Sequence, residues 1–163
     1  MSAHLAAAIR STRDAETDLL HQLRKVGDRH VADHDVAGMC TTLAERTQRR
    51  IDVLDAQLER YGSTVATSGW EGWDHLVAGV RRTASKATSR DPSAGALLVD
   101  DLRSLYLASQ EVLLDWTLLK QGAMVMRDPE LLEGAKKQLP EVERVSAWAK
   151  SRCKLAAPQV LAG

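Results

Sequence analysis

Apolar residues return every three or four positions along most of this chain, which is the spacing of helices that pack on one face. β-branched residues never form the alternating runs of a half-buried strand, so the pattern argues against a sheet. We therefore expect an all-α protein. The pattern predicts four long helices and one shorter helix, at about residues 2–30, 33–61, 94–127 and 128–154, with the shorter one at 70–88.

The connections between these helices differ in length. Short turns follow residues 30 and 127, so each pair of long helices is expected to form an antiparallel hairpin. The connection between the hairpins has about 35 residues and contains the short helix, which is enough to travel the length of a bundle. A ferritin-like four-helix bundle has this connectivity, and although cytokine-type bundles also use long crossovers, the matched hairpin lengths favour the ferritin-like form. We expect one helical-bundle domain over residues 1–155 and a loose tail over residues 156–163.

The first helix carries a glutamate on the seam where packing requires an apolar side chain. Glu16 falls in a series that repeats in steps of four and three, so it is expected to point into the core and to need a positive partner or a metal. Folding each hairpin at its turn puts Glu16 opposite Thr47, with Arg50 one turn away, and Ser109 opposite Ser146. Every long helix thus places a polar residue at mid-height, which predicts a core polar layer of Glu16, Thr47, Arg50, Ser109 and Ser146.

Three stretches of the chain resemble ferritin-like proteins, and most of all the small bacterial stress-response branch typified by YciF. They are Arg13-Asp14-Ala15-Glu16-Thr17-Asp18-Leu19-Leu20, then Glu45-Arg46-Thr47 leading to Ile51-Asp52-Val53-Leu54, and Gln110-Glu111. The resemblance implies a role in stress response. It also implies a core site for two metals, held by one Glu from each of two helices and a Glu-x-x-His pair from each of the other two.

The metal-binding pattern of that family is incomplete in this chain. No Glu-x-x-His occurs, because Glu45 is followed at the third place by Gln48 and Glu141 by Arg144. Two interpretations of Glu16 remain open. In one, Glu16 pairs with Arg50 or Arg46 and hydrogen-bonds Thr47, so that an arginine supplies the charge balance. In the other, it binds iron or manganese with help from three further carboxylates, giving a metal site of Glu16, Glu45, Glu111 and Glu141.

Composition removes several classes of function. Lys plus Arg and Asp plus Glu are 22 each, so no overall charge recruits nucleic acid or an anionic membrane. No apolar run approaches the roughly 20 residues of a membrane span. The two cysteines lack a paired spacing and the N-terminus lacks a signal-peptide pattern, which predicts a cytoplasmic protein.

No phosphate loop, nucleophile elbow or Cys/His pair indicates an enzyme. We expect a non-catalytic bundle without a cofactor, stress-associated as the resemblance implies, that acts through self-association as a homodimer or through a protein partner. The alternative is a di-metal carboxylate protein that binds or oxidises iron or manganese. A second apolar stripe, formed by Leu20 on the first helix and by Val145 and Trp148 on the last, suggests docking of the crossover helix or a homodimer surface.

Overall fold

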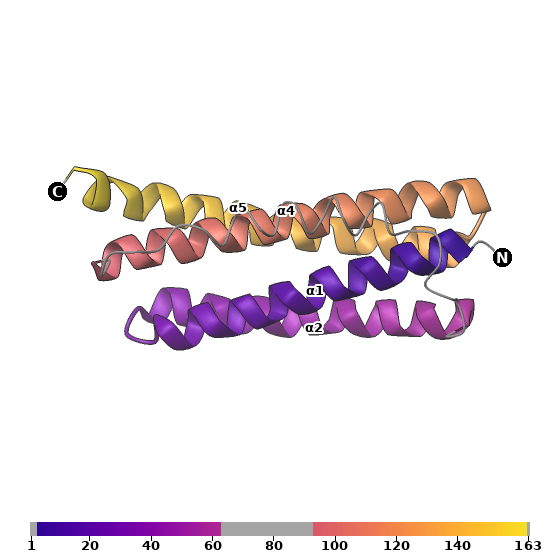
Figure 1. Cartoon of the computed structure of the whole chain (residues 1–163), viewed down its shortest axis with the longest axis horizontal. Coiled ribbons are helices and arrows are strands. Elements are labelled where there is room, and N and C mark those ends of the chain that lie inside the picture. The colour runs from indigo at the N-terminus through magenta and orange to yellow at the C-terminus, as the bar shows by residue number, and fades with distance from the viewer. Residues whose placement is uncertain (1–2, 63–92, 163) are drawn as a thin grey trace.

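The protein is an all-α four-helix bundle made of two antiparallel hairpins (Figure 1). The structure is a computed structural model that describes residues 3–62 and 93–162. The helices in those ranges are α1 (Ala3–Arg29), α2 (His34–Tyr61), α4 (Ala94–Met126) and α5 (Pro129–Leu161). The helix expected at residues 70–88 lies outside the described residues.

Local side-chain chemistry sets several helix ends. The side chains of Asp33, Ser93 and Asp128 each accept a hydrogen bond from the first turn of the helix that follows, which satisfies N–H groups that lack a helical partner. Gly62 ends α2 with φ of 79°, a conformation that glycine adopts without steric cost. Pro129 occupies the first turn of α5, where its missing N–H is not needed.

The last helix is longer than the sequence indicated. We expected it to end near Lys154, but α5 continues to Leu161 and so includes most of the 156–163 segment assigned to a tail. An interior proline usually kinks or breaks a helix, yet α5 is one helix across Pro140. The added part of α5 lies beside the start of α4, because a Cβ added at Gly95 would lie 3.2 Å from a methyl of Val160.

The core lies where the four seams meet. α1 packs against α2 and α4, and α4 packs against α5, while α2 and α5 touch less. Leu20 and Val145 are both buried in this core, so the second stripe expected from them is covered by the bundle itself. None of the described helices combines the length and the apolar character that crossing a membrane requires.

The two hairpins are joined between opposite ends of the bundle. Arg60 and Tyr61, at the end of α2, contact Asp128 in the turn between α4 and α5. Ala94, where α4 begins, lies at the other end (Figure 1). Residues 63–92 therefore connect opposite ends, as the single long crossover predicted from the sequence requires.

Candidate functional site

Glu16 is fully buried and forms a bidentate ion pair with Arg50. Its position on the α1 seam, between buried leucines and alanines, points it into the core, and its exposed fraction is 0%. Arg50 comes from α2 and is 1% exposed. Its Nε lies 2.6 Å from one carboxylate oxygen of Glu16 and its Nη2 lies 2.9 Å from the other. Charge-assisted, two-point contacts of this kind are the strongest that an arginine makes in a protein.

Two further side chains complete this centre. Trp116 on α4 donates its indole N–H to Glu16 Oε1 over 2.7 Å. Thr47 accepts from Arg50 Nη2 over 2.9 Å and donates to the Leu43 carbonyl over 2.8 Å. The buried centre, which we define as Glu16, Thr47, Arg50 and Trp116, thus joins three helices, and each member is at most 1% exposed.

The buried centre offers hydrogen-bond donors, the opposite of what a cation requires. Both oxygens of Glu16 accept N–H groups. Arg50 Nη1 is buried and meets no acceptor among the described residues. A guanidinium stays charged at any physiological pH. A metal ion beside Glu16 would therefore meet a positive charge rather than further ligands, and these residues do not fit a di-metal site.

The polar layer expected across all four helices is divided into two groups. Ser109 and Ser146 do lie opposite each other, with their hydroxyl oxygens 2.7 Å apart, and Gln110 donates to Ser146 over 2.9 Å. The α4 residue that reaches Glu16, however, is Trp116. It lies seven residues after Ser109 along α4, or about 10 Å at 1.5 Å per residue. The serines are therefore a separate cluster between α4 and α5.

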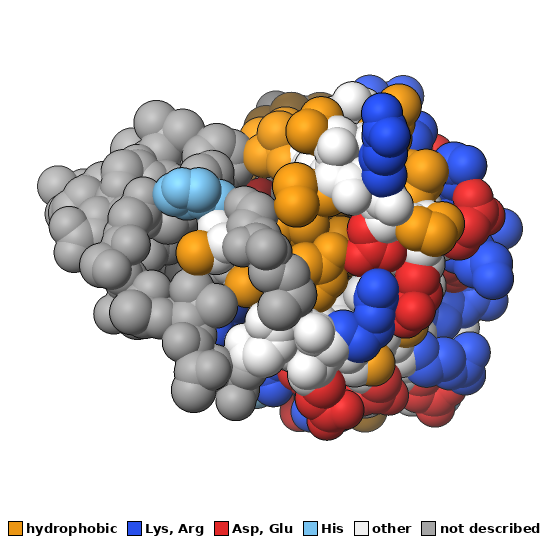
Figure 2. Space-filling view, turned by 90° about the vertical axis from the view of Figure 1, so that its right-hand side faces the viewer, with side chains coloured by type: hydrophobic (Ala, Val, Ile, Leu, Met, Phe, Trp, Pro, Cys, Tyr) orange, Lys and Arg blue, Asp and Glu red, His pale blue; other side chains and the backbone are white. Residues whose placement is uncertain are grey.

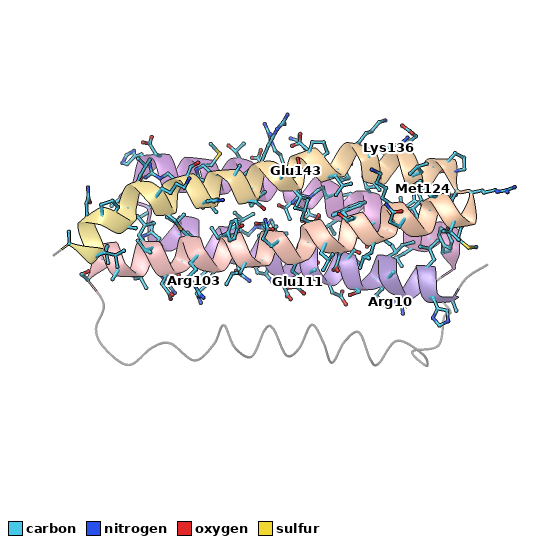
Figure 3. All side chains as sticks on the ribbon, turned by 90° about the horizontal axis from the view of Figure 1, so that it is seen from above. Arg10, Arg103, Glu111, Met124, Lys136 and Glu143 are labelled. Carbon is cyan, nitrogen blue, oxygen red and sulfur yellow. The ribbon has the colours of Figure 1, made fainter. Side chains whose placement is uncertain are left out.

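The other three carboxylates of the metal interpretation do not gather around Glu16. Glu141 is half-buried on α5, where it pairs with Arg46 over 3.2 Å and also accepts from Arg144. Glu111 lies on the outer edge of α4 (Figure 3). Glu45 is exposed on α2. Within residues 3–62 and 93–162, no three His, Cys, Asp or Glu side chains come together in a way that would hold a metal ion.

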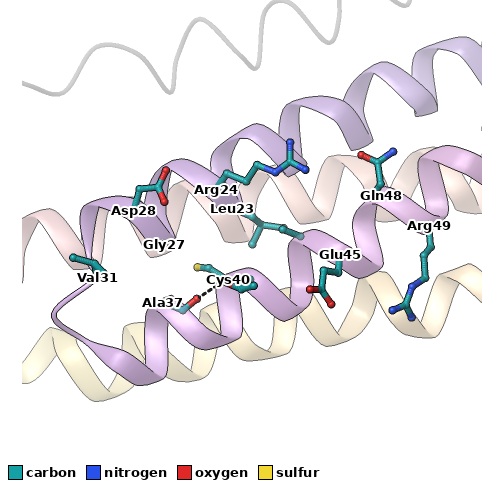
Figure 4. Close-up of a pocket in the computed structure, with 12 residues that line it drawn as sticks. Leu23, Arg24, Gly27, Asp28, Val31, Ala37, Cys40, Glu45, Gln48 and Arg49 are labelled. Carbon is teal, nitrogen blue, oxygen red and sulfur yellow. Dashed lines mark hydrogen bonds between the residues drawn. The ribbon is translucent and has the colours of Figure 1, made fainter.

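Glu45 instead lines a surface groove of about 600 Å³ between α1 and α2 (Figure 4). Charged side chains border this groove, namely Arg24, Asp28, Glu45 and Arg49. Cys40 lies at its base and is 1% exposed. Burial and the nearby charge of Asp101 raise the pKa of the Cys40 thiol to about 11, so the sulfur is protonated at neutral pH and is a poor nucleophile.

Ionic clusters connect the hairpins at both ends of the bundle. At one end, Asp101 on α4 accepts from Arg29 and contacts His30 Nε2, each over 2.8 Å. At the other end, Asp128 accepts from Arg60 and from the Tyr61 hydroxyl. Although burial acts to raise it, the pKa of Asp128 is held below its usual value by hydrogen bonds from Tyr61, the Leu131 N–H and Arg60. Burial and the hydrogen bond to Asp128 raise the pKa of Tyr61 to about 12.

Sequence reasoning missed Trp116 as a member of the buried centre. The apolar spacing of the fourth helix explains Trp116 as a core packing residue and indicates no hydrogen-bond partner for it. A signal was present, because a buried indole N–H nearly always needs an acceptor and Glu16 was the charged acceptor expected in the same core.

No protein-family model, curated protein or solved structure matches this chain at a significant level. The functional argument therefore depends on the contacts and burial of the chain's own residues.

Proposed function

We propose that this protein is a non-catalytic, ferritin-like bundle that acts through self-association or a protein partner, with an arginine–glutamate pair in place of a metal centre. The observation that carries the proposal is that N–H donors from Arg50 and Trp116 occupy both carboxylate oxygens of Glu16. Arg50 balances the charge of Glu16 as a metal would, but it needs no further ligands. The centre then holds three helices together and performs no chemistry.

The connectivity supports the ferritin-like part of the proposal. Two antiparallel hairpins are joined by one connection that runs between opposite ends of the bundle, and single long crossovers of this kind occur in ferritin-like folds. The resemblance of Arg13–Leu20 and Glu45–Thr47 to the YciF-like branch is what supports a role in stress response.

Exposed apolar side chains support a role in binding protein. Met124 and Met126, beside the turn between α4 and α5, are 53% and 44% exposed. Figure 2 shows hydrophobic side chains gathered on this end of the bundle. Exposed apolar patches commonly mark interaction sites, and methionine adapts its shape to different partners.

Metal analysis tests the first part of the proposal. The full chain is purified from cells supplied with iron and manganese, and its metal content is measured beside that of the Glu16→Gln variant. We expect neither protein to hold a stoichiometric amount of either metal. About two metals per chain in the wild type, lost in Glu16→Gln, would instead establish the di-metal alternative.

Site-specific photo-crosslinking in cells tests the second part. A photoreactive residue at position 126 is compared with one at Lys137, which is exposed on the polar side of α5. We expect crosslinks to a second copy or to a discrete protein from position 126 and none from position 137. An absence of crosslinks from both positions contradicts a binding role for this end of the bundle.

A further inference from the structure

α4 is the one described helix with an apolar surface on two opposite faces. Six of the ten large apolar side chains that are exposed among the described residues belong to it. Four of them form what we call the outer stripe: Leu107, Leu114, Leu118 and Val125, with exposed fractions of 40%, 54%, 38% and 81%. Each follows a buried core residue of α4 by two positions, respectively Leu105, Val112, Trp116 and Ala123.

Two positions along an α-helix correspond to a rotation of about 200°. The outer stripe therefore lies on the side of α4 that points away from the bundle core. Apolar side chains on two opposite faces are typical of a helix that packs on both sides. The core covers one side of α4, whereas the outer stripe, which Glu111 and Gln121 interrupt, stays exposed.

The outer stripe continues into a groove between α4 and α1. The groove has a volume of about 420 Å³, and Leu118 and Val125 form part of its wall together with Leu5 and Ala8 of α1. The surface available for docking is therefore concave toward the C-terminal end of α4. Both hairpins contribute to it.

We propose that residues 70–87 of this same chain dock along the outer stripe. This segment lies outside the described residues, and its sequence has one apolar side. The apolar positions Trp70, Trp73, Val77, Val80, Ala84 and Ala87 recur at helical spacing, while Glu71, Asp74, Arg82 and Lys86 fall between them. An amphipathic segment has one face to bury, and the outer stripe is an apolar face on which none of the described helices packs.

The ends of the connection bring the segment to this face. Residues 63–92 leave from beside Asp128, which Tyr61 contacts at the C-terminal end of α4, and arrive at Ser93, the N-cap of α4. The 30 residues of this connection, wound as a helix, would be about 45 Å long, and the 33 residues of α4 are about 50 Å long. A helical connection between these two ends is therefore long enough to follow α4 along its length in the opposite direction.

The two anchored ends also determine which residues of the segment would lie beside which residues of α4. Counting from the two anchored ends, Trp70 and Trp73 fall at the level of Leu118 and Leu114, and Val80 falls at the level of Leu107, to within about one turn. Both tryptophans of the segment thus lie beside exposed leucines of the stripe. Covering α4 with the chain's own segment also leaves Met124 and Met126 at the end of the bundle as the surface for another protein.

Hydrogen–deuterium exchange on the full chain tests the proposal. The stripe variant is Leu114→Asp with Leu118→Asp, and the control variant is Leu155→Asp with Leu161→Asp, which alters two apolar residues of α5 that are also exposed. In the wild type and the control, we expect amides of residues 70–87 to exchange at least about tenfold more slowly than in an unstructured chain. In the stripe variant, this protection is lost while protection of α1, α2 and α5 remains.

Tryptic cleavage gives a second measurement. Cleavage after Arg81 and Arg82 should be slow in the wild type and the control and fast in the stripe variant. Fast exchange of residues 70–87 in the wild type overturns the proposal. So does a stripe variant that leaves exchange and cleavage unchanged, or one whose main effect is to convert a dimer into single chains in light scattering, because a second copy would then cover the stripe.

Discussion

The two charges of the Glu16–Arg50 pair are both buried, at 0% and 1% exposure. Removing either partner leaves the other buried without its counter-charge, and such losses cost about 3 to 5 kcal/mol. Single substitutions of Glu16 and Arg50 therefore test the pair from its two sides.

We predict that Arg50→Met and Glu16→Gln each lower the free energy of unfolding by about 3 to 5 kcal/mol at pH 8, measured by chemical denaturation. Each substitution leaves one charge in the core without its counter-charge, which is the physical reason for the loss.

The double variant Glu16→Gln with Arg50→Met is the control. It removes both charges and keeps an amide oxygen that can accept from the Trp116 indole N–H. Its loss of stability should be smaller than the sum of the two single losses. Additive losses, or single variants within about 0.5 kcal/mol of the wild type, would show that the pair is not a buried, coupled unit.

At the scale of one element, α2 contains two glycines whose conformations differ. Gly38 lies in the interior of the helix, and a Cβ added to it would have no atom within 4 Å. Gly62 ends the helix with a positive φ of 79°. Alanine suits the first conformation better than glycine does and suits the second much worse.

We predict stability changes of opposite sign for the two glycine-to-alanine substitutions. Gly38→Ala should raise the free energy of unfolding by about 0.5 to 1 kcal/mol, because alanine loses less backbone freedom on folding. Gly62→Ala should lower it by about 1 to 3 kcal/mol, because the residue is held in a strained conformation. Thermal or urea unfolding checks both variants, and a shared sign would contradict the C-cap conformation of α2.

At the scale of the whole molecule, polar contacts link the two hairpins at several levels. Asp101 binds Arg29 and His30 at one end, Glu16 binds Trp116 near the middle, and Asp128 binds Arg60 and Tyr61 at the other end. These polar contacts restrict the relative position of the hairpins more than apolar packing does, because a hydrogen bond is lost within about 1 Å of displacement. These contacts therefore favour one offset between the hairpins.

The Asp128 cluster predicts a loss of stability in acid. The pKa of Asp128 is lower in the folded chain than in the unfolded chain, so the folded state binds fewer protons and its stability is fully present above the ordinary carboxyl pKa of 3.8. This stability is lost as pH falls from there through the folded pKa. The Asp128→Asn substitution keeps a side chain that caps helices well at the start of α5, and it removes the titrating carboxyl group.

Unfolding free energies of the wild type and Asp128→Asn, measured from pH 6 to pH 2.5, check this prediction. The difference between the two proteins is expected to shrink as pH falls below about 4. A difference that stays constant over this range would mean that the carboxylate of Asp128 contributes nothing through its charge.

Helix ends and hairpin pairing were predictable from the sequence, because their causes are local. Asp33, Ser93 and Asp128 cap the helices that follow them, and short turns force neighbouring helices to run antiparallel. The extension of α5 to Leu161 was not predictable in this way. In that extension Val160 lies beside Gly95, which is distant in the sequence, and such a neighbour is not visible in a local pattern.

The sequence by itself determined that the chain is all-α, that it folds as two hairpins, and that Glu16 and Arg50 face the core, since periodicity and turn length depend on neighbours along the chain. Turn positions also determined that Ser109 meets Ser146. Only the tertiary structure decided how far one hairpin slides along the other. That offset depends on packing between distant residues, and it brought Trp116 rather than Ser109 to Glu16 and left the outer stripe of α4 uncovered by the described bundle.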